Sequence, residues 1–465
     1  MTIPLFPPSS SSAALHPAAT SDLVRGRNPR TNTLRVRHEG LGNLTKMVAL
    51  LGAMYVVLVF RLHELAPAVV RNVLRPGVLV GPIGIVVMLA MASTSRRAQL
   101  IREPMFKWMI LLLFWASLGV PFALYKGLAV DTVMSMVTLC YLVAGALLLP
   151  KTRLSVERVS TLFALGGSAL AFAGLTVGYV DGGRLGVTGT LDPNDIAAIM
   201  AMCIPFALGR ATRGRLFSRL IAVAAAGMMA TVLVKTGSRG GTLGLVAGAV
   251  TFGLVRPRAS RTIWMVLLCI GGALGWATAT PTFRERILTI GSAADYNETE
   301  YGGRKQIWKR GIGYAFDNPL LGVGAGNFPI AEGGTLTSAG VTGKWSAAHN
   351  MYVQALAELG LVGGTILILM VLYAARCSLP WCGVSAKQPP PNGRALPELF
   401  AALVAVSVSA YFLSMAYSWA LYALFGLAGL AGSVLRSSGP PIKSATASRS
   451  RKVGRGSADR RPTPA

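Results

Sequence analysis

Twelve apolar runs of about 20 residues dominate this sequence and limit what it can fold into. A helix rises about 1.5 Å per residue, so about 20 apolar residues cross the ~30 Å hydrocarbon core of a membrane. The predicted spans are residues 43–60, 77–93, 105–124, 128–149, 159–180, 194–209, 216–234, 240–255, 263–280, 349–374, 399–415 and 418–435. We therefore expect an all-α integral membrane protein with about 12 transmembrane helices.

Composition excludes a soluble globular protein. Of 465 residues, 52% are hydrophobic and only 14% are charged, and the mean hydropathy is +0.53. A soluble chain of this size could not cover so much apolar surface. We expect one polytopic membrane domain over residues 41–435. Residues 1–40 and 436–465 are rich in Ser, Pro, Gly and Arg without periodicity, and we expect them to be disordered basic cytoplasmic tails.

The net charge of +27 orients the chain in the membrane rather than indicating a nucleic-acid partner. Basic residues concentrate in short loops on one side, and such loops face the cytoplasm. The clearest examples are Arg210, Arg213, Arg215 and Arg219 in one loop and Arg256, Arg258 and Arg261 in another. Both termini are therefore expected in the cytoplasm, and residues 281–348 form a large loop on the periplasmic side of a bacterial inner membrane.

The five cysteines point to no disulfide framework and no metal site. Cys140, Cys203 and Cys269 lie within apolar spans, where small core residues are usual. Cys377 and Cys382 have no neighbouring histidine to complete a metal-binding set. We expect no cofactor and no metal ion.

The large loop carries an amphipathic pattern. Apolar groups recur there at helical spacing, at Gln306, Ile307, Trp308, Ile312 and Phe316. This spacing predicts a helix at the membrane surface that ends at Asn318-Pro319. The glycine-rich segment 322–326 predicts a flexible turn. It is not a dinucleotide site, because no strand precedes it.

Basic groups, one histidine and one amide gather on the segments expected outside the membrane. They are Arg184, Lys235, Arg239, Arg304, His349 and Asn350. Guanidinium groups suit a pyrophosphate because they bind two phosphate oxygens and stay charged. Lys235 would add a point charge. His349 opens a helix, whose positive end disfavours imidazolium, and a neutral imidazole suits a general base for a sugar hydroxyl.

Each of these residues also has a structural interpretation. Arg239 could be an interface anchor, Arg184 and Arg304 plain surface charges, and His349 a helix cap or an interface histidine.

Three carboxylates near these groups are expected to be structural. Asp192 and Asp195 flank Pro193 and are expected to cap the following helix. Glu358 lies nine residues after His349, on the opposite helical face, and is expected to be a structural partner of another helix.

Several short motifs follow one another on the expected outer side. They are Asp192-Pro193-Asn194, Ser238-Arg239-Gly240, Arg304 with Trp308, Asn318-Pro319-Leu320-Leu321-Gly322-Val323-Gly324, His349-Asn350 and Glu358-Leu359-Gly360. In the order of these motifs and in their expected location outside the membrane, the chain resembles the O-antigen ligase and Wzy-type O-antigen polymerase superfamily. The resemblance covers residues 180–375 at the level of motifs, and the hydropathy profile extends it over 41–435.

The resemblance implies a metal-independent glycosyltransferase with a GT-C-like fold. Its donor would be a glycan on undecaprenyl pyrophosphate, and its acceptor would be lipid A-core or another lipid-linked glycan. A related branch transfers to protein Ser or Thr. The resemblance assigns Arg239 and His349 as the principal catalytic pair. Arg304 and Arg184 follow as substrate-binding residues, to which the residues themselves add Lys235 and Asn350.

Two functional alternatives stay open at this point. A ligase, which is slightly favoured, and a polymerase differ in the acceptor. A twelve-span transporter is an alternative of another class. It fits less well because loop 210–215 is short, whereas transporters of the commonest kind have a long cytoplasmic connection there.

Overall fold

The computed structural model of the chain describes residues 29–67, 72, 76–256, 258–278, 281–288, 303–338, 345–382 and 396–437. The chain divides into two units, Met1–Asn43 and Leu44–Ala465. In the first unit, the described residues form the beginning of α1, Pro29–Met54, so this helix starts inside the predicted tail 1–40. Residues 1–28 and 438–465, most of the two predicted tails, lie outside the described residues.

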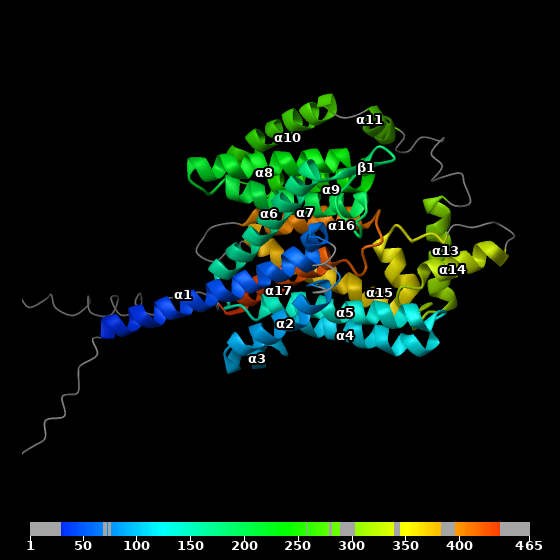
Figure 1. Cartoon of the computed structure of the whole chain (residues 1–465), viewed down its shortest axis with the longest axis horizontal. Coiled ribbons are helices and arrows are strands. Elements are labelled where there is room, and N and C mark those ends of the chain that lie inside the picture. The colour runs from blue at the N-terminus through cyan, green and yellow to red at the C-terminus, as the bar shows by residue number, and fades with distance from the viewer. Residues whose placement is uncertain are drawn as a thin grey trace, which may run out of the picture. The chain divides into compact units, whose positions relative to one another are not determined.

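The second unit is almost entirely helical (Figure 1). After α1 come η1 Tyr55–Val59, η2 Leu62–Leu65, α2 Pro76–Met91, α3 Thr94–Leu100, α4 Pro104–Gly119, η4 Val120–Phe122, α5 Lys126–Leu147, α6 Arg153–Thr176, β1 Tyr179–Asp181, β2 Arg184–Gly186, α7 Pro193–Ala211, α8 Leu216–Lys235, α9 Arg239–Leu254, α10 Arg258–Thr278, α11 Pro281–Leu288, α13 Arg304–Asp317, α14 Phe328–Ser338, α15 Met351–Ser378, η5 Leu379–Cys382, α16 Pro397–Ala410 and α17 Trp419–Ser437. β1 and β2 form an antiparallel hairpin in which Tyr179 pairs with Gly186.

Each of the twelve predicted spans overlaps one of these helices, which confirms the all-α membrane architecture. Within the described residues, nine helices are long and apolar enough to cross a membrane. The other three spans coincide with the shorter helices α2, α9 and α16.

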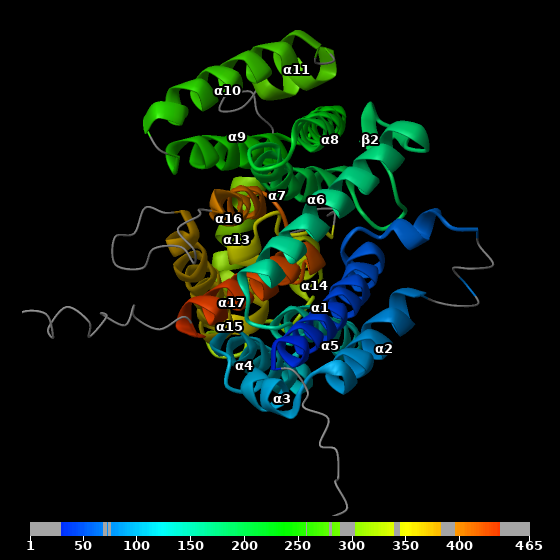
Figure 2. The same ribbon diagram turned by 90° about the vertical axis from the view of Figure 1, so that its left-hand side faces the viewer.

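The centre of the bundle is α17, which packs against α5, α15 and α6 (Figure 2). Almost all its residues are buried. Small residues let its neighbours approach closely, as is usual between membrane helices. Gly426, for example, lies directly against Ala146 of α5.

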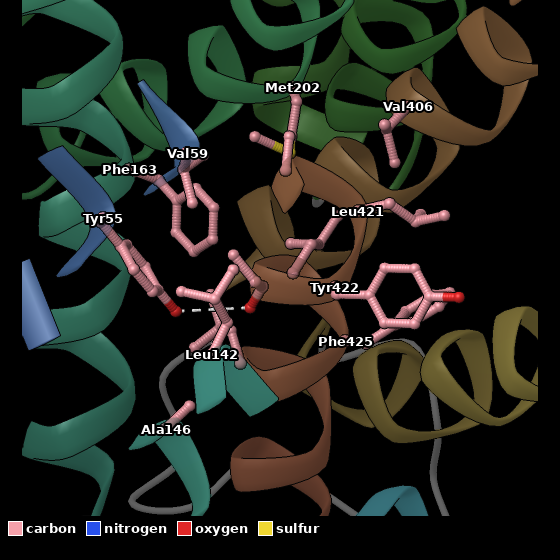
Figure 3. Close-up of a cluster of buried hydrophobic side chains, with 14 of the residues drawn as sticks. Tyr55, Val59, Leu142, Ala146, Phe163, Met202, Val406, Leu421, Tyr422 and Phe425 are labelled. Carbon is pink, nitrogen blue, oxygen red and sulfur yellow. Dashed lines mark hydrogen bonds between the residues drawn. The ribbon is translucent and has the colours of Figure 1, made fainter. Parts of the chain in front are cut away.

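The first span is tied to this centre by aromatic side chains (Figure 3). Tyr55, in the π-helical turn η1, donates a hydrogen bond to the Ala423 carbonyl of α17 at 3.4 Å. Its ring centre lies 5.2 Å from that of Phe163, which stacks on Phe206 of α7 at 5.0 Å. These offset and tilted contacts join four helices in one apolar core.

A second close contact joins α9 to α16. Gly244 and Gly248 lie on the face of α9 that meets Ala405 and Ser409 of α16. A Cβ atom at Gly244 would come within 2.0 Å of the Ser409 hydroxyl, so only glycine permits this approach. The contact sets the position of α9, which begins at Arg239.

α15 is broken within its length at Gly360, where φ is +68°. The break leaves carbonyl groups of the preceding turn without partners in the helix. The segment 318–327 supplies donors, since the N–H groups of Val323 and Gly324 bond to the carbonyls of Ala357 and Glu358 at 2.9 and 3.0 Å. The segment 322–326 forms the predicted turn, with positive φ at Gly322, Gly324 and Gly326. It is largely buried and hydrogen-bonded to α15, which does not fit the predicted flexibility.

Glu358 holds the same segment with its side chain. Its carboxylate accepts from the N–H of Gly326 at 2.8 Å and from that of Phe328 at 3.2 Å. Phe328 is the first residue of α14, so the Glu358 side chain accepts a hydrogen bond at the N-terminus of that helix. Glu358 is therefore a structural partner of another helix, as predicted.

The amphipathic helix of the large loop is present as α13, but it packs differently from the prediction. Ile307, Gly311 and Ala315 form its buried face, which lies against α15. Ile312 and Phe316 are exposed. The helix is therefore attached to the protein by one face and presents its remaining apolar residues outward, a division that the helical period alone does not show.

Loop contacts divide into two groups that match the predicted sides of the membrane. On the predicted outer side, hydrogen bonds join Glu64 to Thr190, Arg184 to Thr236, Tyr125 to Asn327, and His349 to Ser414. On the predicted inner side, ion pairs join Glu103 to Lys151 and Arg436, and Arg213 to Glu398. The contacts fit the alternating topology, and the charge rule predicts which group is outside.

The topology predicts that α13 is periplasmic and that loop 210–215 is cytoplasmic. We expect Lys305→Cys, but not Arg215→Cys, to react with a membrane-impermeant maleimide in intact spheroplasts. Both positions are exposed, and the five native cysteines would be replaced first. Labelling of Arg215→Cys alone would contradict the orientation.

The break in α15 predicts that Gly360→Ala destabilises the protein. A Cβ atom there would lie 2.2 Å from the Leu320 carbonyl oxygen, and a backbone with φ of +68° and ψ of −178° costs a non-glycine residue about 1–3 kcal/mol. We expect a lower melting temperature by fluorescence-detected size-exclusion chromatography. Gly313→Ala, in an open position of α13, is the control and should melt no lower than the wild type. Equal melting of both variants would show that the break is not required.

Candidate functional site

Four of the helices that begin on the predicted outer side form the candidate site, and three of them carry predicted site residues at their N-termini. The four helices are α7, α9, α13 and α15. Asp192 caps α7, accepting from the N–H groups of Asn194 and Asp195, as predicted for Asp192. Ser238 caps α9, and Asn350 caps α15. Helix N-termini favour negative charge, so this end of the bundle is suited to an anion.

His349 directly precedes the cap of α15 and is held in an unusual backbone conformation. Its φ is +47°, and within the described residues Arg61 is the one other non-glycine residue with positive φ. Its N–H donates to the Ser414 hydroxyl at 2.8 Å. Residues held in the left-handed region persist only where their surroundings enforce it.

Residues at the N-termini of α13 and α7 contribute to the electrostatic environment of His349, which itself precedes α15. Burial lowers the pKa of the imidazole below its ordinary value, the positive charge of Arg304 lowers it further, and the negative charge of Asp192 opposes both. The direction agrees with the neutral imidazole predicted from the sequence. Arg304 begins α13 and Asp192 caps α7, so His349 lies within electrostatic range of both.

Arg184 is not a plain surface charge. Its guanidinium donates to the Thr236 carbonyl at 2.8 Å and to the Asn194 side-chain oxygen at 2.7 Å. Thr236 precedes α9 and Asn194 lies in the first turn of α7. Arg184 therefore joins these two helix starts and is itself half-buried.

Arg239 is the first residue of α9 and is half-buried. The next residue, Gly240, lies against Phe412, whose ring contacts Tyr411. Tyr411 in turn contacts Trp308 of α13, so a row of aromatic rings runs from the start of α9 to α13. This row links Arg239 to the group around His349.

The other two predicted residues have different surroundings. Lys235 ends α8 and is exposed. Among the described residues, no hydrogen bond or ion pair joins its side chain to the other predicted site residues. Asn350 is only 2% exposed, and its side-chain oxygen accepts from the N–H groups of Tyr352 and Val353. Its observed role is to cap α15.

Arg61 and Glu64, which follow the first span on the predicted outer side, also lie close to the candidate site. Neither was identified from the sequence. Arg61 lies over the Trp419 ring at 5.2 Å and pairs with Glu64 at 3.2 Å. Glu64 also accepts from the N–H of Thr190 at 3.2 Å. A basic residue directly after the first span was the available signal, but it is also what the end of any membrane span looks like.

The arrangement combines half-buried arginines, helix N-termini and an imidazole of lowered pKa. It can bind a phosphate-bearing anion and accept a proton beside it. Within the described residues no group of three or more His, Cys, Asp or Glu side chains could hold a metal ion.

The chain was compared with known protein families and with curated proteins. Residues 224–368 match the family described as O-Antigen ligase. The matched segment includes Lys235, Arg239, Arg304, His349 and Asn350, and Arg184 precedes it. No curated protein matches the chain.

The proximity of Arg304 predicts a coupled titration. Arg304→Gln removes a positive charge and should raise the pKa of His349 toward its ordinary value, while burial continues to lower it. NMR titration of histidine-labelled protein would measure the change, with the His349 signal identified by its loss in His349→Gln. Lys305→Gln, an exposed neighbour, should shift it less. An unchanged pKa in Arg304→Gln would place Arg304 away from His349 in solution.

Proposed function

We propose that this chain, a member of the O-antigen ligase and Wzy-type superfamily by its residues 224–368, transfers a glycan from undecaprenyl pyrophosphate to an acceptor on the periplasmic face of the bacterial inner membrane. The observation that carries the proposal is that the hydrogen bond from Trp308 joins α13, which begins at Arg304, to the residue before His349, at a junction of helix N-termini that also holds Arg184 and Arg239.

The arginines serve the leaving group. As the acceptor oxygen bonds to the anomeric carbon, the bond from that carbon to the pyrophosphate oxygen breaks, and negative charge collects on undecaprenyl pyrophosphate. Arg239 and Arg304, with Arg184 at the edge, bind and stabilise this charge. Arg239 and Arg304 already lie at helix N-termini, so little reorganisation is needed as the charge develops.

His349 serves the acceptor. The hydroxyl of the acceptor sugar must lose a proton as it attacks, and a neutral imidazole accepts it. Burial and Arg304 favour the neutral form, so the base stays available at a lower pH than an ordinary histidine would. Turnover should consequently fall only in mildly acidic solution, and Arg304→Gln should move that fall to higher pH.

We favour lipid A-core as the acceptor, which makes the protein an O-antigen ligase. The match to the family described as O-Antigen ligase supports glycan processing at the membrane and does not distinguish the two acceptors. The alternative is a polymerase, which passes the glycan to another lipid-linked repeat. Both reactions use the same donor and leaving group, so an assay with each purified acceptor decides between them. The family match disfavours the transporter.

The proposal also includes the surroundings of the reaction. Membrane lipid covers the exposed apolar faces, such as Phe217 and Leu220 of α8 and Ile263 of α10. Both termini lie in the cytoplasm, nucleic acid is not a partner, and the reaction needs no metal, because arginines take the place of a cation at the pyrophosphate.

The test is to measure turnover and donor affinity separately in purified protein. His349→Ala should lower turnover by about 10²–10⁴-fold and leave donor binding nearly unchanged. Arg239→Lys keeps the charge but loses the planar fork, so it should weaken donor binding and turnover together.

Lys309→Ala, at an exposed position on α13, is the control and should behave like the wild type. Wild-type activity should also survive excess chelator. Full turnover of folded His349→Ala would exclude the base role, and near-normal donor binding by Arg239→Lys would make Arg239 an interface anchor.

A further inference from the structure

The peptide group between Ala348 and His349 is held at both of its polar atoms. Its carbonyl oxygen, on Ala348, accepts from the Trp308 indole N–H at 3.0 Å. Its N–H, on His349, donates to the Ser414 hydroxyl at 2.8 Å. The two side chains come from different elements, α13 and the turn between α16 and α17.

We propose that Trp308 and Ser414 are positioning residues that clamp this peptide group and thereby keep His349 in its left-handed conformation near the start of α13. The inference rests on the proposed role of His349 as the base. Neither residue touches the substrate in this proposal, and each acts through the His349 backbone.

The strained backbone shows why a clamp is needed. A non-glycine residue with φ of +47° relaxes toward negative φ unless its surroundings prevent it. Such a relaxation would turn the Cα–Cβ bond and move the imidazole away from Arg304. The peptide group before His349 is the unit that rotation about φ displaces, and it is the unit that both hydrogen bonds hold.

Trp308 is itself fixed in place. Its ring meets Tyr411 at 5.3 Å between centres and 74° between planes. The neighbouring residue Ile307 packs with Phe328, Ala348 and Val353 in a small apolar cluster. A rigid ring holds its N–H in one direction, so the donor to Ala348 cannot swing away.

Trp308 also lies one helical turn after Arg304. A displacement of α13 would therefore move Arg304 and Trp308 together.

Ser414 is fixed by its own turn. The N–H of Ala416 bonds to the Gln354 side chain of α15 at 3.2 Å, and the Tyr422 hydroxyl donates to the Ala416 carbonyl at 3.0 Å. The turn is thus tied to α15 and α17. Ser414 therefore belongs to the helical bundle, whereas Trp308 belongs to the outer loop.

The test uses substitutions that remove one hydrogen bond each. Trp308→Phe keeps an aromatic ring against Tyr411 and loses the N–H. Ser414→Ala loses the hydroxyl, and Ser414→Thr keeps it. We expect Trp308→Phe and Ser414→Ala each to lower kcat about tenfold with donor KM within about twofold, because misplacement of a catalytic group costs rate rather than donor binding. Ser414→Thr should retain most of the activity.

The two hydrogen bonds act on one peptide group, so their effects should not add. The double variant should lose much less than the product of the two single losses. Trp345→Phe and Ser338→Ala, at exposed positions of the same outer region, are matched controls and should keep wild-type kcat.

A second readout does not depend on activity. The NMR signal of the His349 imidazole should move, and its pKa should rise toward the ordinary value in both clamp variants as the ring leaves Arg304. Folded Trp308→Phe and Ser414→Ala with wild-type kcat and an unchanged His349 signal would overturn the clamp. If Trp308→Phe does not fold, the Ser414→Ala and Ser414→Thr pair decides. If His349→Ala proves fully active, the base role fails, while the NMR shifts still test the clamp.

Discussion

Three polar side chains in the first half of α15 satisfy backbone groups that would otherwise be buried without partners. Asn350, Gln354 and Glu358 are spaced four residues apart, so they share one face of the helix. Asn350 caps α15 itself, Gln354 accepts from the turn after α16, and Glu358 accepts from the start of α14. An unpaired N–H in an apolar surrounding costs roughly 1–3 kcal/mol. The irregular segments before α14 and after α16 can therefore pack in apolar surroundings because α15 supplies hydrogen-bond acceptors.

This row of acceptors places the candidate site. The segment held by Glu358 leads into α14, whose first residue Phe328 packs with Ile307 of α13. α13 carries Arg304 at its start and Trp308 one turn later, and Trp308 bonds to the carbonyl before His349. A chain of contacts through α14 and α13 thus connects Glu358 to the residue before His349. Burial and the charge of Arg304 favour a neutral imidazole at His349, and the positive helix ends and the arginines favour an anionic ligand.

The sequence predicted some elements of this region well and others poorly, for identifiable reasons. The spans follow from hydropathy, and the capping role of Asp192 follows from its place before Pro193. The helix α13 was expected from its period, but its buried face is the one with Gly311, because the small residue admits Phe328 and Val353. Asn350 was grouped with ligand-binding residues since it adjoins His349, and it caps a helix. Arg61 was missed because its closeness to Trp419 joins segments more than 300 residues apart in the chain.

The sequence by itself determined the membrane architecture, the alternation of loops, the order of motifs and the residue types suited to a pyrophosphate. These depend on local properties, namely hydropathy, helical period and charge, which each segment carries alone. The tertiary structure alone decided that His349 has positive φ, that Arg304 and Asp192 act on its pKa, and that Trp308 and Ser414 hold one peptide group from two sides. Those features arise from contacts between elements far apart in the chain, and no local pattern in the sequence records which distant side chain completes a hydrogen bond.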